Sequence, residues 1–365
     1  MRLHLVSLPH TQTTNASQVC AFTQKAVKFC KMMTDLGYEV ILYAGEENEA
    51  ACTEHVVCVT QDQQRRWYGD FDPNTLPTIA TFNPDHVPWL VMNERVIEEM
   101  RKRIEPEDII CLTMGRCQMQ IAAAFPEHQH VEWAVGYEGI FSGFCCFESY
   151  AWMHNRYGAN NIVDGRFYDT VIPNFFFTEQ FSYCETPSDY LLFVGRITAR
   201  KGVHVASEIA KRAGRQLLIA GPGVTESSPG RIASHEYVIE GDHINYIGIL
   251  DPLTREEIMK NAAAIIVPTL YIEPFGAVAV EAMLSGTPAI TTDWGAFPET
   301  NVHGTTGYRF RTLAEGVQAV EDLDKLDRLA LRKFTQDRYS IETIGPQYDR
   351  WFQNVHGLWQ DGWYA

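Results

Sequence analysis

The segment EPFGAVAVE places two glutamates, Glu273 and Glu281, eight residues apart around a Pro-Phe-Gly turn and a run of small apolar residues. This pattern predicts a helix that begins near Phe275 and Gly276. The first N–H groups of such a helix can donate to phosphate oxygens, and Gly276 and Ala277 keep bulky side chains away from them. Carboxylates accept hydrogen bonds from vicinal hydroxyls. We predict that one glutamate binds a sugar, the other binds a ribose, and the helix N-terminus binds phosphates.

The alternative is a buried helix that carries two incidental acids. Two carboxylates in so apolar a segment would then need partners that neutralise them, because an unpaired buried charge is costly.

A second group of polar residues lies in FVGRITARKG, residues 193–202. We expect a strand that ends at Gly195, with Arg196 and Lys201 in the loop before the next helix. Arginine offers a fork for phosphate oxygens and lysine offers a point charge, so the pair suits a diphosphate. A solvated loop with ordinary basic residues is the alternative for this segment taken alone.

A Gly-Pro-Gly turn follows another predicted strand in LIAGPGV, residues 218–224. Gly221 begins this turn and is a candidate for close approach to a nucleotide. The third glycine of a dinucleotide fingerprint is missing, because Thr225 and Glu226 follow, so the pattern does not predict NAD binding.

Strand-like and helix-like segments alternate along the whole chain, which predicts an α/β fold with two doubly wound parallel sheets. Residues 61–90 are rich in Pro, Asn and Asp, and we expect a loop-dominated insertion there. The expected domains are 1–173, a linker at 174–189, a second domain at 190–340 and a C-terminal helix at 341–365. Ligands of such sheets bind beyond the carboxyl ends of the strands, so we expect a cleft that faces both domains.

Composition and charge disfavour a secreted, a membrane-spanning and a nucleic-acid-binding protein. The chain has 365 residues, nine cysteines without a CxxC pair and a formal net charge of −16. The N-terminus has no signal-peptide pattern and no apolar run approaches a transmembrane length, so we expect a cytoplasmic protein with reduced thiols and no strong membrane signal. The acidity disfavours nucleic acid as a partner.

Three segments carry a resemblance to a known family: FVGRITARKG, EPFGAVAVEAMLSGTPAITT and WGAFPETNVHGTTGYRF. They resemble the retaining glycosyltransferases of family 4, which have the GT-B fold and an E-x7-E signature, here Glu273 to Glu281. The resemblance spans about 190–312, and VIPNFFF at 171–177 is similar to the inter-domain element of that family. The GT-B fold implies two Rossmann-like domains and a C-terminal helix that returns to the first.

The resemblance also implies roles for individual residues. Arg196 and Lys201 would bind the diphosphate of a sugar nucleotide, Glu273 would contact the donor sugar and Glu281 the ribose. We therefore assign Glu273, Arg196 and Lys201 as catalytic candidates. The donor-binding candidates are Glu281, Gly195, Phe275, Gly276, Ala277 and Gly221.

The first half of the chain departs from the family pattern. The loop after the first strand reads PHTQTTNAS, where family members have a glycine-rich loop, and the histidine expected near the donor sugar is absent from VGYEGIFSG. The acceptor-side or sugar-side candidates are Thr14, Asn15, Tyr137, Glu138 and His154. For His154 the alternative is a structural histidine on an aromatic helix.

The resemblance implies a retaining glycosyltransferase that uses a UDP or GDP sugar as co-substrate, with no cofactor. An Asp-x-Asp pair at Asp70 and Asp72 is similar to a metal-binding motif. The cationic pair and the helix N-terminus would already neutralise the diphosphate, so we expect no metal. The acceptor remains open among a glycan, a lipid-linked glycan, a protein and a modified nucleobase. The alternatives are a non-catalytic sugar-nucleotide-binding protein and a GT-B sugar-nucleotide epimerase. A phosphorylase would need a lysine-bound pyridoxal phosphate and a longer chain.

Overall fold

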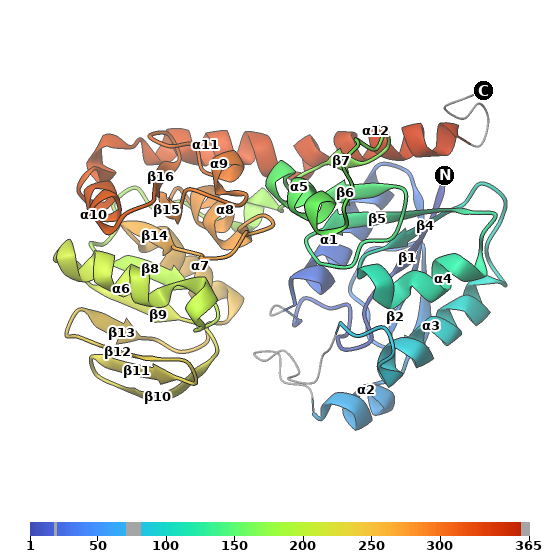
Figure 1. The fold of residues 1–365 in the computed structure, drawn as a ribbon, viewed down its shortest axis with the longest axis horizontal. Helices are drawn as coiled ribbons and strands as arrows, with labels where there is room; N and C mark the ends of the chain where they lie inside the picture. Colours follow the sequence, from blue (N-terminus) through green and yellow to red (C-terminus); the bar gives the residue numbers. More distant parts are fainter. Residues whose placement is uncertain (18–19, 71–81, 359–365) are drawn as a thin grey trace. The chain divides into compact units, whose positions relative to one another are not determined.

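The computed structural model describes residues 1–17, 20–70 and 82–358. The chain forms two compact units (Figure 1). Unit 1 contains Met1–Phe175 and the segment that begins at Ile341, and unit 2 contains Phe176–Ser340.

Unit 1 is built on a seven-stranded parallel sheet with the order β3-β2-β1-β4-β5-β6-β7. Its strands are β1 Arg2–Val6, β2 Glu39–Gly45, β3 Glu54–Val59, β4 Ile109–Leu112, β5 Gln129–Val135, β6 Cys145–Phe147 and β7 Thr170–Val171. Its helices are α1 Ala21–Asp35, α2 Gln61–Tyr68, α3 Val87–Met100, η1 Gly115–Gln118, α4 Met119–Ala124, α5 Tyr150–Ala159 and α12 Ile341–Gly357.

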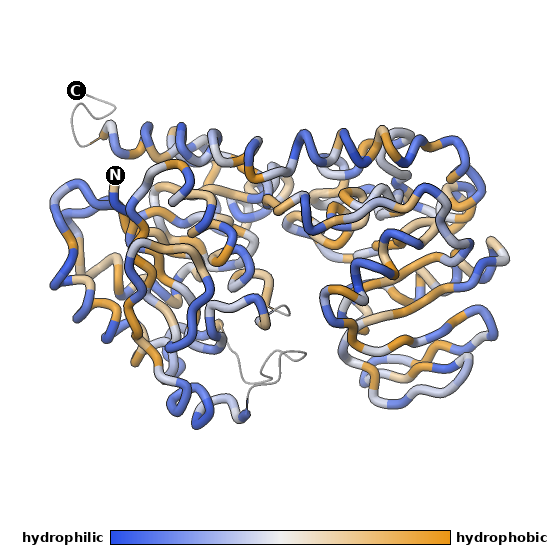
Figure 2. Tube along the Cα trace, turned by 180° about the vertical axis from the view of Figure 1, so that it is seen from behind, coloured by the Kyte–Doolittle hydropathy of each residue, from blue (hydrophilic) through white to orange (hydrophobic). Residues whose placement is uncertain are grey.

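Helices cover both faces of this sheet, because alternate strand residues point to opposite sides. Leu3 and Leu5 of β1 pack in one core cluster with residues of α1 and α12. Val6 of the same strand belongs to a second cluster with residues of α3 and α4. In Figure 2 the strands are mostly hydrophobic and the outer turns of the helices carry hydrophilic segments.

The insertion expected at 61–90 is more regular than its composition indicated. Thr60 and Gln63 form a capping box that starts α2, and α3 begins at Val87 with a proline in its first turn. Residues 71–81 lie outside the described part of the chain, as does Asp72 of the Asp-x-Asp pair. Asp70 forms an exposed ion pair with Arg65 at 3.3 Å.

The helix α12 packs on unit 1 through its aromatic side chains. The ring of Tyr348 meets that of Phe29 edge-on at 5.5 Å, and Trp351 donates its indole N–H to the carbonyl of Tyr168 at 2.8 Å. These contacts explain why the last described residues, 341–358, belong to unit 1 although the chain reaches them after unit 2.

Unit 2 has a six-stranded parallel sheet with the order β13-β9-β8-β14-β15-β16. Its strands are β8 Leu191–Val194, β9 Leu217–Ala220, β13 Ile244–Tyr246, β14 Ala264–Val267, β15 Ala289–Thr292 and β16 Gly307–Phe310. Its helices are η2 Thr178–Gln180, η3 Ala199–Lys201, α6 Val203–Arg212, α7 Pro252–Asn261, α8 Ala277–Leu284, α9 Phe297–Thr300, α10 Leu313–Glu321, η4 Leu323–Lys325 and α11 Arg328–Tyr339.

A small antiparallel sheet is inserted between β9 and β13. It consists of β10 Val224–Ser228, β11 Arg231–Ser234 and β12 Val238–Glu240. Ile232 and Ile239 of this sheet join the core cluster of unit 2 that contains Leu217 and Ile244. The sequence reasoning assigned no element to these residues.

The segment 174–189 was expected to be a linker, but most of it is part of unit 2. The ring of Phe176 is buried and stacks near Phe275 at 6.3 Å, and Arg332 donates to the carbonyl of Phe181 at 2.7 Å. The change of unit therefore falls at Phe176, where this aromatic packing begins.

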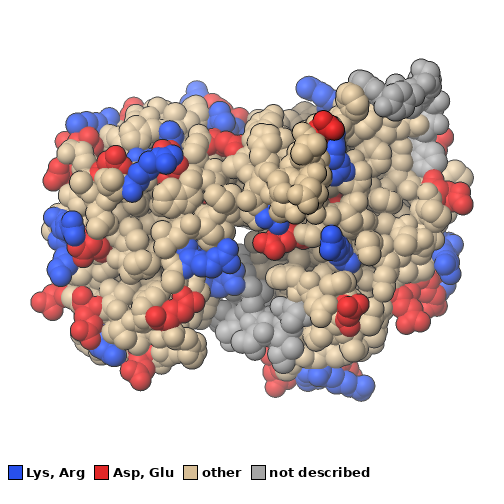
Figure 3. Space-filling model, viewed as in Figure 1, with Lys and Arg blue, Asp and Glu red and all other residues tan. Residues whose placement is uncertain are grey.

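Acidic and basic side chains are interspersed over the face of the protein drawn in Figure 3. Along the residues that the structure describes, no helix combines the length and the apolar character needed to cross a membrane.

Candidate active site

Two loops of unit 2 follow the neighbouring strands β8 and β14 and are held against each other. The amide of Leu270 donates to the carbonyl of Arg200 at 2.8 Å. Gly202 has a φ of +74°, and a Cβ there would lie 2.1 Å from the carbonyl oxygen of Pro268, so only glycine fits. This contact brings the loop of residues 195–202 onto the loop of residues 268–276 at the carboxyl edge of the sheet.

Lys201 and Glu273 meet where these two loops touch. Lys201 Nζ lies 2.9 Å from Glu273 Oε2, and the Tyr271 hydroxyl donates to Glu273 Oε1 at 2.9 Å. The side chain of Glu273 is only 11% exposed, so its charge is compensated inside the protein. Burial lowers the pKa of Lys201, but the interactions with Glu273 and Tyr271 together outweigh burial and raise that pKa above its usual value. The ammonium therefore stays charged at neutral pH.

Two arginines belong to the same loop as Lys201. Arg196 is exposed and directly follows Gly195 at the end of β8. The guanidinium of Arg200 lies over the ring of Tyr271, 4.6 Å from its centroid. The carboxylate of Glu236, in the turn between β11 and β12, accepts a hydrogen bond from the amide of Ala199. The small antiparallel sheet thus supports the cationic loop.

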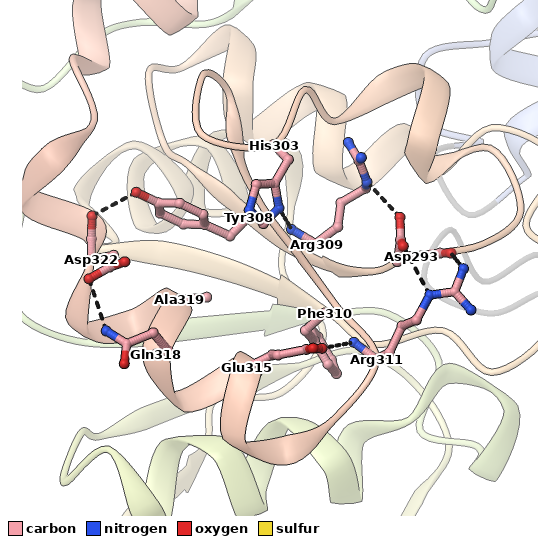
Figure 4. Close-up of a pocket in the computed structure, with 10 residues that line it drawn as sticks. All are labelled: Asp293, His303, Tyr308, Arg309, Phe310, Arg311, Glu315, Gln318, Ala319 and Asp322. Atoms are coloured by element: carbon pink, nitrogen blue, oxygen red, sulfur yellow. Dashed lines mark hydrogen bonds and ion pairs between the residues drawn. The ribbon is translucent and has the colours of Figure 1, made fainter.

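The backbone of Glu273 is fixed by the loop after β15. The amide of Ala296 donates to the carbonyl of Glu273 at 3.0 Å. Gly295 has a φ of +62°, and a Cβ there would lie 2.6 Å from the amide nitrogen of Glu273. The same loop starts at Asp293, whose carboxylate accepts from Arg309 at 2.7 Å and from Arg311 at 3.0 Å (Figure 4).

Asp293 also lines a pocket of about 370 Å³. Figure 4 shows this pocket between the strand that carries Tyr308 and the helix that carries Gln318. Burial opposes ionisation of Asp293, but the hydrogen bonds from Arg309 and Arg311 lower the pKa of its carboxyl. The pocket contains none of the residues that the sequence nominated, and its ion pairs anchor the loop that holds Glu273.

The helix α8 begins at Ala277, directly after the start that was predicted near Phe275 and Gly276. Gly276 is its N-cap and has a φ of +81°, a left-handed conformation that ends the preceding loop. Phe275 points into the core and is 3% exposed. Phe275 can therefore bind a ligand only through its backbone.

Glu281 lies in the second turn of α8. Its carboxylate is 3.6 Å from the guanidinium of Arg255 on α7, and its side chain is 17% exposed. This separation exceeds a normal hydrogen bond, so Glu281 can accept hydrogen bonds from a ligand hydroxyl.

Gly221 allows the turn after β9 to touch the end of β8. Its φ is +135°, and a Cβ there would lie 2.0 Å from the carbonyl oxygen of Gly195. Tyr246 donates its hydroxyl to the carbonyl of Gly221 at 2.9 Å. Gly195 and Gly221 therefore lie side by side at the carboxyl edge of the sheet.

In unit 1 the nominated residues have separate partners and do not form one cluster. Tyr137 is buried, donates to Glu132 at 3.2 Å, and burial raises its pKa. Glu138 is exposed and lies 3.8 Å from Arg156. His154 is exposed, and its ring lies 6.3 Å from that of Tyr150.

Thr14 and Asn15 belong to a loop after β1 that is packed by polar contacts. Thr14 is 7% exposed, its carbonyl accepts from Gln24 at 3.0 Å, and the amide of Asn15 donates to Glu49 at 2.6 Å. In the same loop, burial lowers the pKa of His10 to about 4.

The sequence reasoning missed a buried ion pair in unit 1. Lys25 of α1 and Glu148, the residue after β6, are in contact and are 5% and 4% exposed. Lys25 also lies over the ring of Phe22, 4.6 Å from its centroid. The available signal was a lysine among Phe22, Ala26 and Phe29, apolar residues that recur at helical spacing.

Tyr271 was also missed. It lies in the loop after β14, which ends at Val267. An aromatic residue two positions before the first glutamate was the available signal.

The chain resembles known proteins in sequence. Residues 179–329 match the model of the glycosyl transferases group 1. A glycogen synthase of Mycobacterium tuberculosis is 33% identical over 124 residues, which is 32% of this chain and 29% of that protein. A phosphatidyl-myo-inositol mannosyltransferase of the same species is 28% identical over 187 residues, 46% of this chain and 47% of that protein.

The likeness of fold extends over nearly the whole chain. Sucrose-phosphate synthase from Thermosynechococcus elongatus aligns with a TM-score of 0.68 at 16% identity, covering 98% of this chain and 100% of that structure. The prediction of a GT-B fold with two Rossmann-like domains is confirmed. The match to the group 1 model falls within unit 2, Phe176–Ser340. The chain spans between about a third and a half of the length of these curated relatives.

Proposed function

We propose that the chain is a retaining glycosyltransferase of family 4 that transfers a sugar from a UDP or GDP sugar to an acceptor hydroxyl. The observation that carries this proposal is the contact of Lys201 with Glu273, at 2.9 Å, beyond the carboxyl ends of β8 and β14. A diphosphate needs a cation and a sugar hydroxyl needs an acceptor, and this pair places both groups side by side. The group 1 domain match supports the same reading.

In this proposal the cations stabilise the leaving group. Sugar transfer separates a cation-like sugar from a diphosphate anion, so fixed positive charge lowers the barrier. Arg196 and Lys201 supply two cations, and the first N–H groups of α8 add partial positive charge. Because these groups can neutralise the diphosphate, we propose a metal-independent reaction whose only co-substrate is the nucleotide sugar.

The two glutamates would recognise the two sugars of the donor. Glu273 would accept hydrogen bonds from the transferred sugar, because its carboxylate lies beside the proposed phosphate ligand Lys201. Glu281, in the second turn of α8, would accept hydrogen bonds from the ribose hydroxyls. Glycines 195 and 221 would let the backbone approach the nucleotide.

Retention is proposed to follow a front-face route. Both oxygens of the Glu273 carboxylate already accept hydrogen bonds, which makes it a weak nucleophile. The bond from the anomeric carbon to the phosphate oxygen would break as the acceptor oxygen bonds to the same face. The acceptor proton would pass to the leaving phosphate oxygen.

The acceptor is proposed to be a hydroxyl of a sugar or a glycolipid. The names of the two mycobacterial relatives, a glycogen synthase and a phosphatidyl-myo-inositol mannosyltransferase, support this class of acceptor.

Thermal unfolding with UDP, GDP and ADP tests the donor site. A nucleoside diphosphate at about a hundred times its Kd should raise the Tm of unit 2 by roughly 5–10 °C. Glu281→Ala should remove most of that shift, because the ribose loses its acceptor. Glu321→Ala, an exposed glutamate at the end of α10, is the matched control and should keep the shift.

The outcomes separate the competing readings. A shift with one nucleoside diphosphate that Glu281→Ala abolishes supports the donor site. A shift without any sugar transfer would instead indicate a non-catalytic binding protein. No shift with any of the three nucleotides would contradict the proposal.

A further inference from the structure

Tyr271 makes three contacts with charged side chains at the proposed donor site. Its hydroxyl donates to Glu273 Oε1 at 2.9 Å. Its ring has the guanidinium of Arg200 4.6 Å from its centroid and the ammonium of Lys201 at 5.0 Å. The side chain of Tyr271 therefore contacts Glu273, the residue proposed to bind the sugar, through its hydroxyl, and two cations through its ring.

Burial raises the pKa of Tyr271, and the charge of Glu273 raises it further. The hydroxyl therefore keeps its proton at neutral pH and remains a donor. Glu273 Oε1 has this hydroxyl as its partner, whereas Oε2 has Lys201.

We infer that Tyr271 is a positioning residue that keeps Glu273 oriented toward the donor sugar; this inference rests on the proposed function. When a diphosphate enters, it competes with Glu273 Oε2 for the ammonium of Lys201. The hydrogen bond from Tyr271 does not involve the diphosphate, so it holds the carboxylate while the lysine changes partner. The ring, in turn, keeps Arg200 and Lys201 beside the phosphates.

The hydroxyl is not needed to hold the loop in place. The backbone of this loop is fixed by the amide of Leu270, which donates to Arg200, and by the amide of Ala296, which donates to Glu273. Removal of the hydroxyl alone should therefore leave the loop folded and change only the orientation of the Glu273 carboxylate.

Two substitutions separate the hydroxyl from the ring. Tyr271→Phe should weaken binding of the nucleotide sugar and lower kcat, each by about 10-fold, because a hydrogen bond to a charged group is lost. Binding of the free nucleoside diphosphate should stay within about 2-fold, since the ring still faces the cations. Tyr271→Ala should weaken binding of both ligands. Tyr308→Phe, which removes a hydroxyl bonded to the carbonyl of Asp322 elsewhere in unit 2, is the matched control.

A double-mutant cycle gives the decisive readout. If Tyr271 acts through Glu273, Tyr271→Phe should have no further effect on nucleotide-sugar binding in a Glu273→Gln background, to within about 2-fold. Equal losses for the nucleotide sugar and the nucleoside diphosphate in Tyr271→Phe, or additive losses in the cycle, would overturn the inference and leave the proposed function standing. Failure of the wild type to bind any nucleoside diphosphate would remove the proposed function, and the inference with it.

Discussion

Replacement of Lys201 by alanine should lower the rate of sugar transfer by about 10²–10³-fold, the loss typical of removing one preorganised electrostatic contact. The ammonium is the cation in direct contact with Glu273, and both groups are largely withdrawn from water. Its removal deprives the leaving diphosphate of a stabilising positive charge. It also leaves the Glu273 carboxylate with Tyr271 as its remaining hydrogen-bond donor in the site.

The rate should be measured as kcat with saturating donor, alongside the Kd of the nucleoside diphosphate. Lys211→Ala is the matched control, because Lys211 is an exposed lysine in the last turn of α6 and should have no effect. A Lys201→Ala protein that folds and keeps its rate within about 3-fold of wild type would exclude Lys201 from the stabilisation of the leaving group.

Replacement of Glu148 by alanine should lower the free energy of unfolding of unit 1 by about 3–5 kcal/mol, because it leaves the buried ammonium of Lys25 without its counter-charge. For a unit of this size, this corresponds to a fall in Tm of roughly 6–20 °C. Circular dichroism during thermal unfolding would measure it. Glu138→Ala removes an exposed glutamate with 79% of its side chain accessible and should change the Tm by less than about 2 °C.

The double variant Lys25→Met with Glu148→Leu separates charge from packing. A buried ion pair can often be replaced by apolar residues at little cost, so the double variant should recover most of the lost stability. A loss below about 1 kcal/mol for Glu148→Ala would show that water or another group compensates Lys25, which would contradict the buried geometry.

The fold could be predicted from the sequence because parallel strands buried on both faces read as continuous apolar runs. The apolar runs before Gly195 and before Glu273 indicated two strands of unit 2, which the structure ends at Val194 and Val267. Since adjacent parallel strands end at the same edge, the loops after them had to meet, which brought Lys201 beside Glu273.

Other features depend on contacts between distant segments, which a local pattern does not reveal. The pairing of Lys25 with Glu148 joins α1 to the end of β6 across more than a hundred residues. Tyr137 was nominated for the acceptor or sugar side, but its hydroxyl donates to the buried carboxylate of Glu132.

The central claim is that this chain consumes a nucleotide sugar, and the most direct measurement is the release of nucleoside diphosphate from UDP and GDP sugars. The assay supplies a mixture of sugar and glycolipid acceptors and compares the wild type with Glu273→Gln. We expect one donor to be consumed by the wild type, with the anomeric configuration of the product retained in its NMR spectrum, and a loss of at least about 10²-fold in the variant. Inversion at the anomeric carbon, or equal donor consumption by wild type and variant, would contradict the account, as would no release above the protein-free control.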